Sequence, residues 1–346
     1  MQLPRLIAFI LISAIGFPTQ ADYQVEDVAD GLDHPWSVAF LPDGSLLVAE
    51  LAGNLRRVSN GTVGAPIANV PEVFRLSQAG LFDVLLDPRF EDNATLYLSF
   101  AAGDIDQNAT TVVQAMLAGD SLEEVTTLFA AVPKKSGPLH YGGRLAWMQT
   151  GQLMLTVGDG SDFREAAQDP EEHLGKTIVI EPGQPPVIFT SGHRNAQGLA
   201  VSKDGTIFLH EHGPRGGDEV NLIESGKNYG WPLATHGIDY HGARISPFKE
   251  LPNFENGIHV WVPSIAPSGL MIYEGDMFPE WQGDLFVGAL VDKEVRRLDM
   301  EGPQVVAEQA VFPEISARIR DIRQAPDGSI YVLTDENPGR IVRVFR

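Results

Sequence analysis

Residues 193–232 read HRNAQGLAVSKDGTIFLHEHGPRGGDEVNLIESGKNYGWP. The middle of this stretch, residues 198–210, predicts two β-strands joined by a turn at Lys-Asp-Gly, because two apolar runs flank residues that favour a turn. Polar residues that a plain hairpin does not need stand on both sides of it. His193, Arg194 and Asn195 precede the hairpin, and Asp218 and Glu219 follow it. The hairpin is therefore interpreted as scaffold and its flanks as a candidate site.

The same pattern of apolar strand, turn and apolar strand recurs along the chain. Its six copies begin at Val38, Val84, Leu145, Leu199, Leu270 and Ile322. The copies start roughly 45 to 70 residues apart, which is enough for a four-stranded antiparallel blade with its loops. Residues 54–58, 110–116, 295–298 and 340–346 are predicted as outer strands, and residues 165–175 as a short helix. Six such units overfill a single sandwich, so we predict an all-β fold, a six-bladed β-propeller.

Composition narrows the range of partners. The 346 residues carry a formal net charge of −21, which argues against nucleic acid or an anionic membrane surface as partner, since both are polyanions. The negative charge indicates either plain solubility or carboxylates that hold a cation. The chain has no cysteine, which excludes disulfides, thiolate zinc sites, Fe–S clusters and cysteine nucleophiles.

Residues 1–21 resemble a targeting segment in their layout. One basic residue, Arg5, precedes an apolar run over residues 6–17, and small and polar residues follow up to Ala21. This order is typical of a secretory signal peptide, and the run is short for a membrane span. The alternative is a buried N-terminal helix. We expect a signal peptide over 1–21 and one catalytic domain over 22–346, periplasmic or secreted, with no membrane insertion of the mature chain.

His140 and Asp159 stand at the two ends of the third hairpin. His140 comes just before its first strand, and Asp159 just after its second. Hairpin geometry brings these two loops to one end of a blade. A carboxylate bonded to one imidazole nitrogen fixes the tautomer and leaves the other nitrogen basic, as in a general base. The alternative is a pair that only caps two loops.

Two further groups lie before the fourth and sixth hairpins. Arg194 and Asn195 suit an anionic or carbonyl-rich ligand, or else a structural bond to loop carbonyls. Arg318 and Arg320 alternate, which places both on one face of an extended segment. Two guanidinium groups on one face indicate an anion between them, and the alternative is a pair of surface salt bridges.

The loop after the fourth hairpin contains Gly213, Pro214 and Glu219. Its carbonyls and carboxylates suit a hard cation such as Ca²⁺, and the alternative is an acidic, solvated turn. His210 and His212 stand two apart on one strand, as a metal pair would, but such residues also occur for structural reasons. Their role stays open.

Nine short pieces, in this order, resemble one family. They are GLDHPW (31–36), QAGL (78–81), HYGGRL (140–145), GD (158–159), GHRNAQG (192–198), GP (213–214) with DE (218–219), NYGWP (228–232), APS (266–268) and RIRD (318–321). Together they resemble the soluble aldose sugar dehydrogenases that depend on pyrroloquinoline quinone (PQQ), relatives of soluble quinoprotein glucose dehydrogenase. The family fold is a six-bladed propeller, which agrees with the repeat count.

The resemblance implies roles for the site residues. His140 matches the base that takes the proton from the anomeric hydroxyl as hydride leaves for the quinone, and Asp159 matches its orienting partner. The remaining implied cofactor contacts are Gln78, Arg194, Asn195, Arg318 and Arg320. A cofactor-binding Lys of the family has no match in register here, and Lys293, about two residues away, is the nearest candidate.

The resemblance also implies two Ca²⁺ sites. The carbonyls of Gly213 and Pro214 match the ion that binds the quinone, and Glu219, the Tyr229 carbonyl and Asp239 match a second, structural ion. The predicted function is oxidation of aldose sugars to lactones with PQQ and Ca²⁺, electrons passing to an unidentified acceptor. The alternatives are a Ca²⁺-dependent lactonase on the same fold and a propeller binding module that has lost the cofactor.

Overall fold

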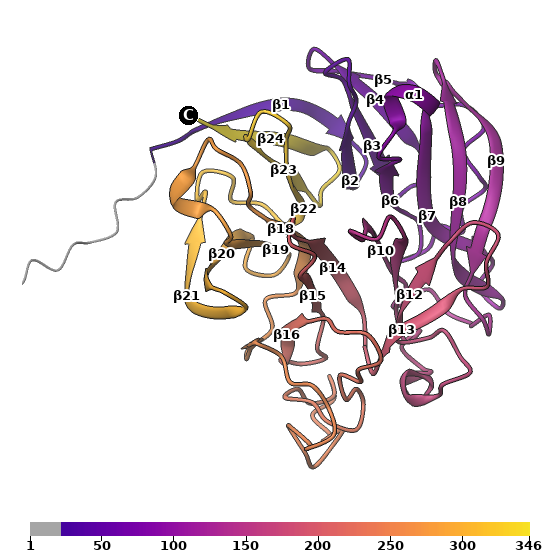
Figure 1. Ribbon diagram of the computed structural model, residues 1–346, viewed down its shortest axis with the longest axis vertical. Helices are drawn as coiled ribbons and strands as arrows, with labels where there is room; N and C mark the ends of the chain where they lie inside the picture. Colours follow the sequence, from indigo (N-terminus) through magenta and orange to yellow (C-terminus); the bar gives the residue numbers. More distant parts are fainter. Residues whose placement is uncertain (1–21) are drawn as a thin grey trace, which may run out of the picture.

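The computed structural model describes residues 22–346, so the predicted signal peptide lies outside the described residues. Within the described part, six four-stranded antiparallel sheets surround a central axis, as Figure 1 shows. The predicted six-bladed β-propeller is confirmed. No helix of the described residues is long and apolar enough to cross a membrane.

Each blade uses consecutive strands, except the last. Blade one contains β2 (Pro35–Phe40), β3 (Leu46–Glu50), β4 (Leu55–Ser59) and β5 (Thr62–Pro66). Blade two contains β6 (Leu81–Leu86), β7 (Thr95–Gly103), β8 (Asn108–Ala118) and β9 (Ser121–Ala130). Blade three contains β10 (Gly142–Trp147), β11 (Leu153–Val157), β12 (Lys176–Ile180) and β13 (Val187–Ser191).

Blade four contains β14 (Ala196–Val201), β15 (Ile207–Glu211), β16 (Asp218–Leu222) and β17 (His259–Trp261). Blade five contains β18 (Pro267–Ile272), β19 (Leu285–Ala289), β20 (Glu294–Glu301) and β21 (Gln304–Val311). Blade six contains β22 (Ile319–Gln324), β23 (Ile330–Thr334), β24 (Gly339–Phe345) and, from the other end of the chain, β1 (Gln24–Leu32). All six predicted hairpins are therefore the two inner strands of a blade.

Helical structure within residues 22–346 is limited to short turns. They are α1 (Phe90–Asn93) and 3₁₀ segments over Arg164–Gln168 and Pro279–Trp281. The helix predicted over residues 165–175 is thus one 3₁₀ segment at the start of that range.

The turns of the inner hairpins follow from local sequence. Asp43 accepts a hydrogen bond from the backbone N–H of Ser45 at 2.9 Å, while Gly44 takes a φ of 82° that residues with a side chain rarely adopt. Asp327 and Ser329 repeat the same contact in blade six, also at 2.9 Å. In blades one and six, an Asp-Gly turn therefore sets where the inner strands reverse.

The hydrophobic core is divided among the blade interfaces. Leu47, Leu55, Leu81 and Leu98 pack between blades one and two, and comparable clusters lie at the other five interfaces. The innermost strands β2, β6, β10, β14, β18 and β22 contact one another around the ring. The blades are thus held by their neighbours and surround the axis.

The six inner hairpins share an irregularity that shapes the site. In every one, the register between the two inner strands shifts near the beginning of the first strand. Such bulges redirect side chains and are frequent beside active sites. Residues left without a partner by these shifts include Trp36, Arg144, Gln197 and Arg320. The first strands therefore present side chains toward the axis at one end of the ring.

Candidate active site

A cavity of 290 Å³ opens at the end of the propeller where the first strands begin. Its walls include four of the predicted cofactor contacts: Gln78, Asn195, Arg318 and Arg320. These residues come from blades two, four and six and are far apart in the sequence. The ring brings them together, as the sequence predicts.

The predicted pair of His140 and Asp159 lies beside this cavity. His140 Nδ1 lies 2.7 Å from Asp159 Oδ1, and the His140 backbone N–H donates to Gln78 Oε1 at 2.9 Å. His140 Nε2 makes no hydrogen bond to any residue within 22–346. The arrangement fixes one nitrogen and leaves the other available for a proton.

Close backbone packing holds the two loops that carry this pair. His140 adopts a left-handed φ of 52°, and a Cβ at Gly158 would lie 2.3 Å from the His140 carbonyl oxygen. Only glycine fits at 158. Gly142, the first residue of β10, donates its N–H to Asn195 Oδ1 at 3.1 Å, so blade four supports the end of the histidine loop as well.

The charges around the pair favour a neutral imidazole and an ionised carboxylate. Burial lowers the pKa of His140, and the hydrogen bond that His140 donates to Asp159 only partly opposes this. Burial raises the pKa of Asp159, but His140 and Arg194 outweigh it and hold that pKa below its usual value. Lys135, whose own pKa burial lowers to about 8, also acts to lower the pKa of His140. The electrostatics therefore suit a base that works near neutral pH.

Arg194 is held by the loop that follows β15. Its Nη1 donates to the carbonyl oxygens of His212 at 3.0 Å and Gly213 at 2.9 Å. Its guanidinium carbon lies 5.5 Å from the ring centre of Trp231. Arg194 is 5 % exposed, so this cation is fixed in place beside the site.

Arg318 and Arg320 share one carboxylate. Asp335 Oδ2 accepts from Arg318 Nη2 at 3.0 Å and from Arg320 Nη2 at 3.1 Å. Burial raises the pKa of Asp335, but the two arginines outweigh it and lower that pKa to about 2. The two arginines thus form salt bridges with Asp335. Because two cations share one anion, an excess of positive charge faces the cavity.

Arg320 is oriented by neutral groups as well. Its Nη1 donates to Gln197 Oε1 at 3.0 Å and to Ser268 Oγ at 3.1 Å, while its buried Nε has no partner among the described residues. Gln197 Oε1 also lies 3.2 Å from His212 Nε2. The cavity wall is therefore a connected polar network that includes a buried donor without a partner among the described residues, Arg320 Nε.

The predicted Ca²⁺ ligands Gly213 and Pro214 line a second, adjoining cavity of 760 Å³. His212 borders both cavities. The Gly213 oxygen accepts from Arg194, as described above, and its N–H donates to Asp218 Oδ1 at 2.8 Å. The turn lies close to the site, but two carbonyls are fewer than the six to eight oxygens that Ca²⁺ takes.

The residues of the predicted second Ca²⁺ site are not all joined. Burial, and then the charge of Glu211, raises the pKa of Glu219 to about 8. The Tyr229 ring stacks on His193, which binds Glu211 at 2.7 Å. Asp239 instead lies 3.3 Å from Arg164 and makes no described contact with Glu219. No hydrogen bond or ion pair within residues 22–346 joins Asp239 to Glu219 or Tyr229, and the assignment of Asp239 to this site stays a prediction.

Lys293 does not reach the cavity. It lies in the exposed turn between β19 and β20, with a φ of 58°, and Leu290 from the same loop lines the cavity instead. The turn directs the residue at 293 outward, so no lysine from blade five contacts the cavity among the residues described.

His210 and His212 contact different parts of the structure. His210 Nε2 contacts the Gly269 carbonyl oxygen at 3.0 Å, joining blades four and five, and burial lowers its pKa to about 3. His212 contacts Gln197 at the cavity wall. The two rings serve different neighbours, and no group of three or more His, Asp or Glu residues within 22–346 could hold a metal ion.

Several residues that line the cavity were not predicted as cofactor contacts from the sequence. Other residues that line the cavity are His34, Trp36, Leu51, Arg75, Ser77, Gln197, His212, Leu290 and Asp335. A repeat signal exists for one of them. An acidic residue ends or follows the second strand in four blades, as Glu50, Asp159, Glu211 and Asp335. Aligning the repeats on these positions could have identified Asp335.

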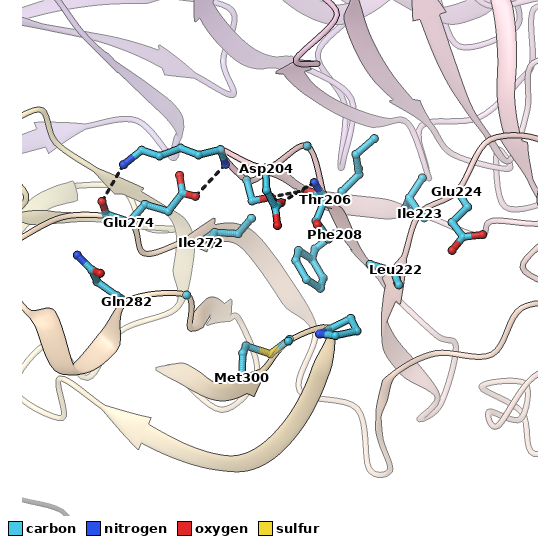
Figure 2. Close-up of a pocket in the computed structure, with 17 residues that line it drawn as sticks. Asp204, Thr206, Phe208, Leu222, Ile223, Glu224, Ile272, Glu274, Gln282 and Met300 are labelled. Carbon is cyan, nitrogen blue, oxygen red and sulfur yellow. Dashed lines mark hydrogen bonds between the residues drawn. The ribbon is translucent and has the colours of Figure 1, made fainter.

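A larger cavity of 850 Å³ lies at the opposite end of the strands, between blades four and five (Figure 2). Phe208, Ile272 and Met300 line it. The Lys203 ammonium donates to the Glu274 carbonyl oxygen at 3.0 Å, and the Lys203 N–H to its carboxylate at 2.8 Å. These polar groups already bind each other, so this cavity offers no comparable set of free functional groups.

The carboxylates at the propeller axis are paired with arginines. Arg323 contacts Asp83 and Asp321 at 2.9 Å each, and the fully buried Arg144 contacts Asp321 at 3.0 Å. A lactonase would need central carboxylates that are free to hold a metal. Asp83 and Asp321 already bind guanidinium groups instead.

Known proteins share this fold and much of this sequence. The glucose/sorbosone dehydrogenase family matches residues 32–343. Aldose sugar dehydrogenase YliI of Escherichia coli K12 is 38 % identical over 361 residues, covering 98 % of this chain and 97 % of its own. The apo crystal structure of the soluble aldose sugar dehydrogenase from Escherichia coli superimposes with a TM-score of 0.88 at 38 % identity, covering 93 % of this chain and 99 % of its own.

A further solved structure is the PQQ-bound form of an aldose sugar dehydrogenase from Streptomyces coelicolor. It has a TM-score of 0.76 at 26 % identity and covers 94 % of this chain and 99 % of its own. The match over residues 32–343 spans all the site residues described above. The chain therefore belongs to the glucose/sorbosone dehydrogenase family.

Proposed function

We propose that this protein is a PQQ-dependent aldose dehydrogenase that oxidises the anomeric carbon of aldose sugars to the lactone. The observation that carries the proposal is the placement of the His140–Asp159 pair beside a cavity lined by Arg318 and Arg320. A base and an anion site so placed suit removal of a proton next to a polycarboxylate cofactor. Family membership supports the same chemistry.

The donor set of the cavity fits the cofactor. PQQ is a planar quinone bearing carboxylates, and the cavity combines two guanidinium groups with the amides Gln78 and Asn195. The unpaired buried Nε of Arg320 is a further donor for an acceptor-rich ligand. Arg318 and Arg320 would hold the carboxylates, and Arg194 would lie at the quinone oxygen.

The residues of this chain supply binding and proton chemistry. His140 Nε2 takes the proton of the anomeric hydroxyl, because Nδ1 is already held by Asp159. Asp159 stabilises the imidazolium that forms, and Arg194 offers positive charge to an oxygen that gains electron density. When bound, PQQ would supply the two-electron acceptor for the hydride lost from the anomeric carbon, and loss of that hydride together with the hydroxyl proton would leave the carbonyl of the lactone.

Calcium completes the proposal at the Gly213–Pro214 turn. The carbonyls there supply two oxygens, and the cofactor and water would supply the rest. A second ion at Glu219 and the Tyr229 carbonyl is supported by the resemblance, whereas Asp239 is engaged with Arg164. A periplasmic or secreted location and an electron acceptor of unidentified nature belong to the same proposal.

Reconstitution tests the proposed function. Purified protein mixed with PQQ and Ca²⁺ is expected to reduce an artificial dye when an aldose is added, and neither PQQ nor the aldose alone is expected to suffice. Chelation of Ca²⁺ before reconstitution should reduce the yield of active enzyme. Absence of both dye reduction and any change in quinone absorbance with several aldoses would contradict the proposal.

Binding provides a second test that does not depend on turnover. Arg320→Ala removes a charged donor and is expected to weaken PQQ binding by about 10-fold to 100-fold, measured by quenching of tryptophan fluorescence. Arg57→Ala is the matched control, because Arg57 forms surface ion pairs with Asp43 and Asp120 outside the cavity. Equal dissociation constants for the two variants would remove Arg320 from the proposed cofactor site.

A further inference from the structure

Trp231 contacts the carboxylate oxygen of Asp159 that does not bind His140. Its indole Nε1 donates to Asp159 Oδ2 at 2.8 Å. The other oxygen, Oδ1, accepts from His140 at 2.7 Å and from the Ser161 N–H at 2.7 Å. Both oxygens of a fully buried carboxylate are thus engaged, and the indole is the only side-chain donor to Oδ2 among the residues described.

The same indole lies against the second group of the site. The Arg194 guanidinium carbon is 5.5 Å from its ring centre, within the range of a cation–π contact. The Trp231 backbone is held on both sides, since its N–H donates to the Gly192 oxygen at 3.0 Å and its carbonyl accepts from Gln168 Nε2 at 2.7 Å. At 6 % exposed, Trp231 has little freedom to move.

We infer that Trp231 is a positioning residue that holds the Asp159 carboxylate for His140 and the guanidinium of Arg194 in one arrangement. The inference rests on the proposed function of His140 as base. A neutral N–H donor fixes the carboxylate plane without giving up a proton, so Oδ1 stays directed at Nδ1 and Nε2 stays unprotonated at neutral pH. Trp231 thereby links the base of blade three to the cation of blade four.

The inference specifies what loss of the indole N–H does to His140. Asp159 faces the imidazole as the anion, and Arg194 and Lys135 face it as cations. Without the donor at Oδ2, the negative charge of Asp159 acts more strongly at Oδ1 and favours the protonated imidazole. The pKa of His140 should therefore rise, and a smaller fraction of the base should be free at neutral pH.

Trp231→Phe tests this inference, because phenylalanine keeps a ring over Arg194 and removes only the donor. In the apo protein, the NMR titration midpoint of His140 is expected to move to higher pH. In reconstituted enzyme, kcat should fall about 10-fold and the acid limb of kcat/KM should move in the same direction, while the dissociation constant of PQQ changes less than about twofold.

Trp261→Phe is the matched control. Trp261 is also 6 % exposed, and its Nε1 donates to Glu308 at 2.9 Å, on the outer part of blade four. It should change neither the His140 midpoint nor kcat. In wild-type protein the indole proton of Trp231 should titrate together with His140, a readout available even where the variant does not fold.

The outcomes separate the two proposals. An unchanged His140 titration midpoint in Trp231→Phe overturns the positioning role. So does an indole proton signal of Trp231 that does not change with pH as His140 titrates. A shifted midpoint in a protein that never oxidises aldoses supports the positioning role while contradicting the proposed function.

Discussion

At the scale of single residues, His140 has a left-handed backbone conformation that residues other than glycine rarely adopt. Its φ of 52° is maintained by contacts from three directions: Gln78 at the backbone N–H, Asp159 at the ring and the bare Gly158 behind the carbonyl. Strain of this kind costs of order 1–3 kcal/mol and persists where the surroundings determine it. The loop therefore holds the imidazole in one place before any ligand binds.

His140→Ala should separate binding from turnover. The variant keeps Gln78, Asn195 and both arginines of the cavity, so the dissociation constant of PQQ should stay nearly unchanged. Removal of the proton acceptor should lower kcat by at least about 10²-fold. Fluorescence titration and dye reduction measure the two quantities. Turnover at the wild-type rate would show that another group accepts the proton.

At the scale of elements, local signals predicted the blades better than the site. The signals for turns and apolar strands lie close together in the sequence, so the six hairpins could be predicted without knowledge of the rest of the chain. The acceptor of the Trp231 indole, Asp159, lies 72 positions away, and no local pattern indicates that contact. Lys293 was assigned by sequence proximity, whereas the turn geometry directs it away from the cavity.

Acidic residues near the end of the second strand have different partners in different blades. Glu50, the last residue of β3, binds Arg56 in blade one, and Asp159, two residues after β11, binds His140 in blade three. Asp335, directly after β23 in blade six, binds both arginines of the cavity. One element of the repeat thus supplies carboxylates whose partners differ with the blade.

Asp335→Asn should lower stability in a pH-dependent way. The folded-state pKa of Asp335 is about 2, below its usual value of 3.8, so its stabilisation is present above pH 3.8 and is lost as the pH falls toward 2. The shift corresponds to about 2 kcal/mol at neutral pH. Urea unfolding of the variant should show this loss at pH 7 and a smaller one below about pH 4.

Asp292→Asn provides the control for that measurement. Asp292 pairs with Arg296 at 2.8 Å on an exposed turn, where an ion pair is worth about 0–1 kcal/mol. Equal losses in the two variants, or a loss for Asp335→Asn that does not depend on pH, would contradict the assignment.

At the scale of the whole molecule, the ring is closed by the two ends of the described chain. β1 pairs with β24 in antiparallel register from Gln24 opposite Phe345 to Leu32 opposite Gly339, and the two strands lie side by side in Figure 1. Arg340 extends the closure through an ion pair with Asp27 at 3.0 Å. Since the cavity draws on blades one and six, this closure also positions His34 and Asp335 across from each other.

A chain that begins after β1 should therefore lose stability and associate more readily through the exposed edge of β24. Leu32 is fully buried between blades six and one, and without β1 the edge of β24 is left unpaired. Relative to a chain that begins at Asp22, we expect the Tm to fall by about 10 °C or more and light scattering to increase. Leu32→Ala, which keeps the strand, should lower the Tm by less and leave scattering unchanged. A peptide of residues 22–32 added to the shortened chain should restore part of the Tm, because it can pair with β24. An unchanged Tm, or no response to the peptide, would show that the ring stays closed with three strands in blade six, without the N-terminal strand.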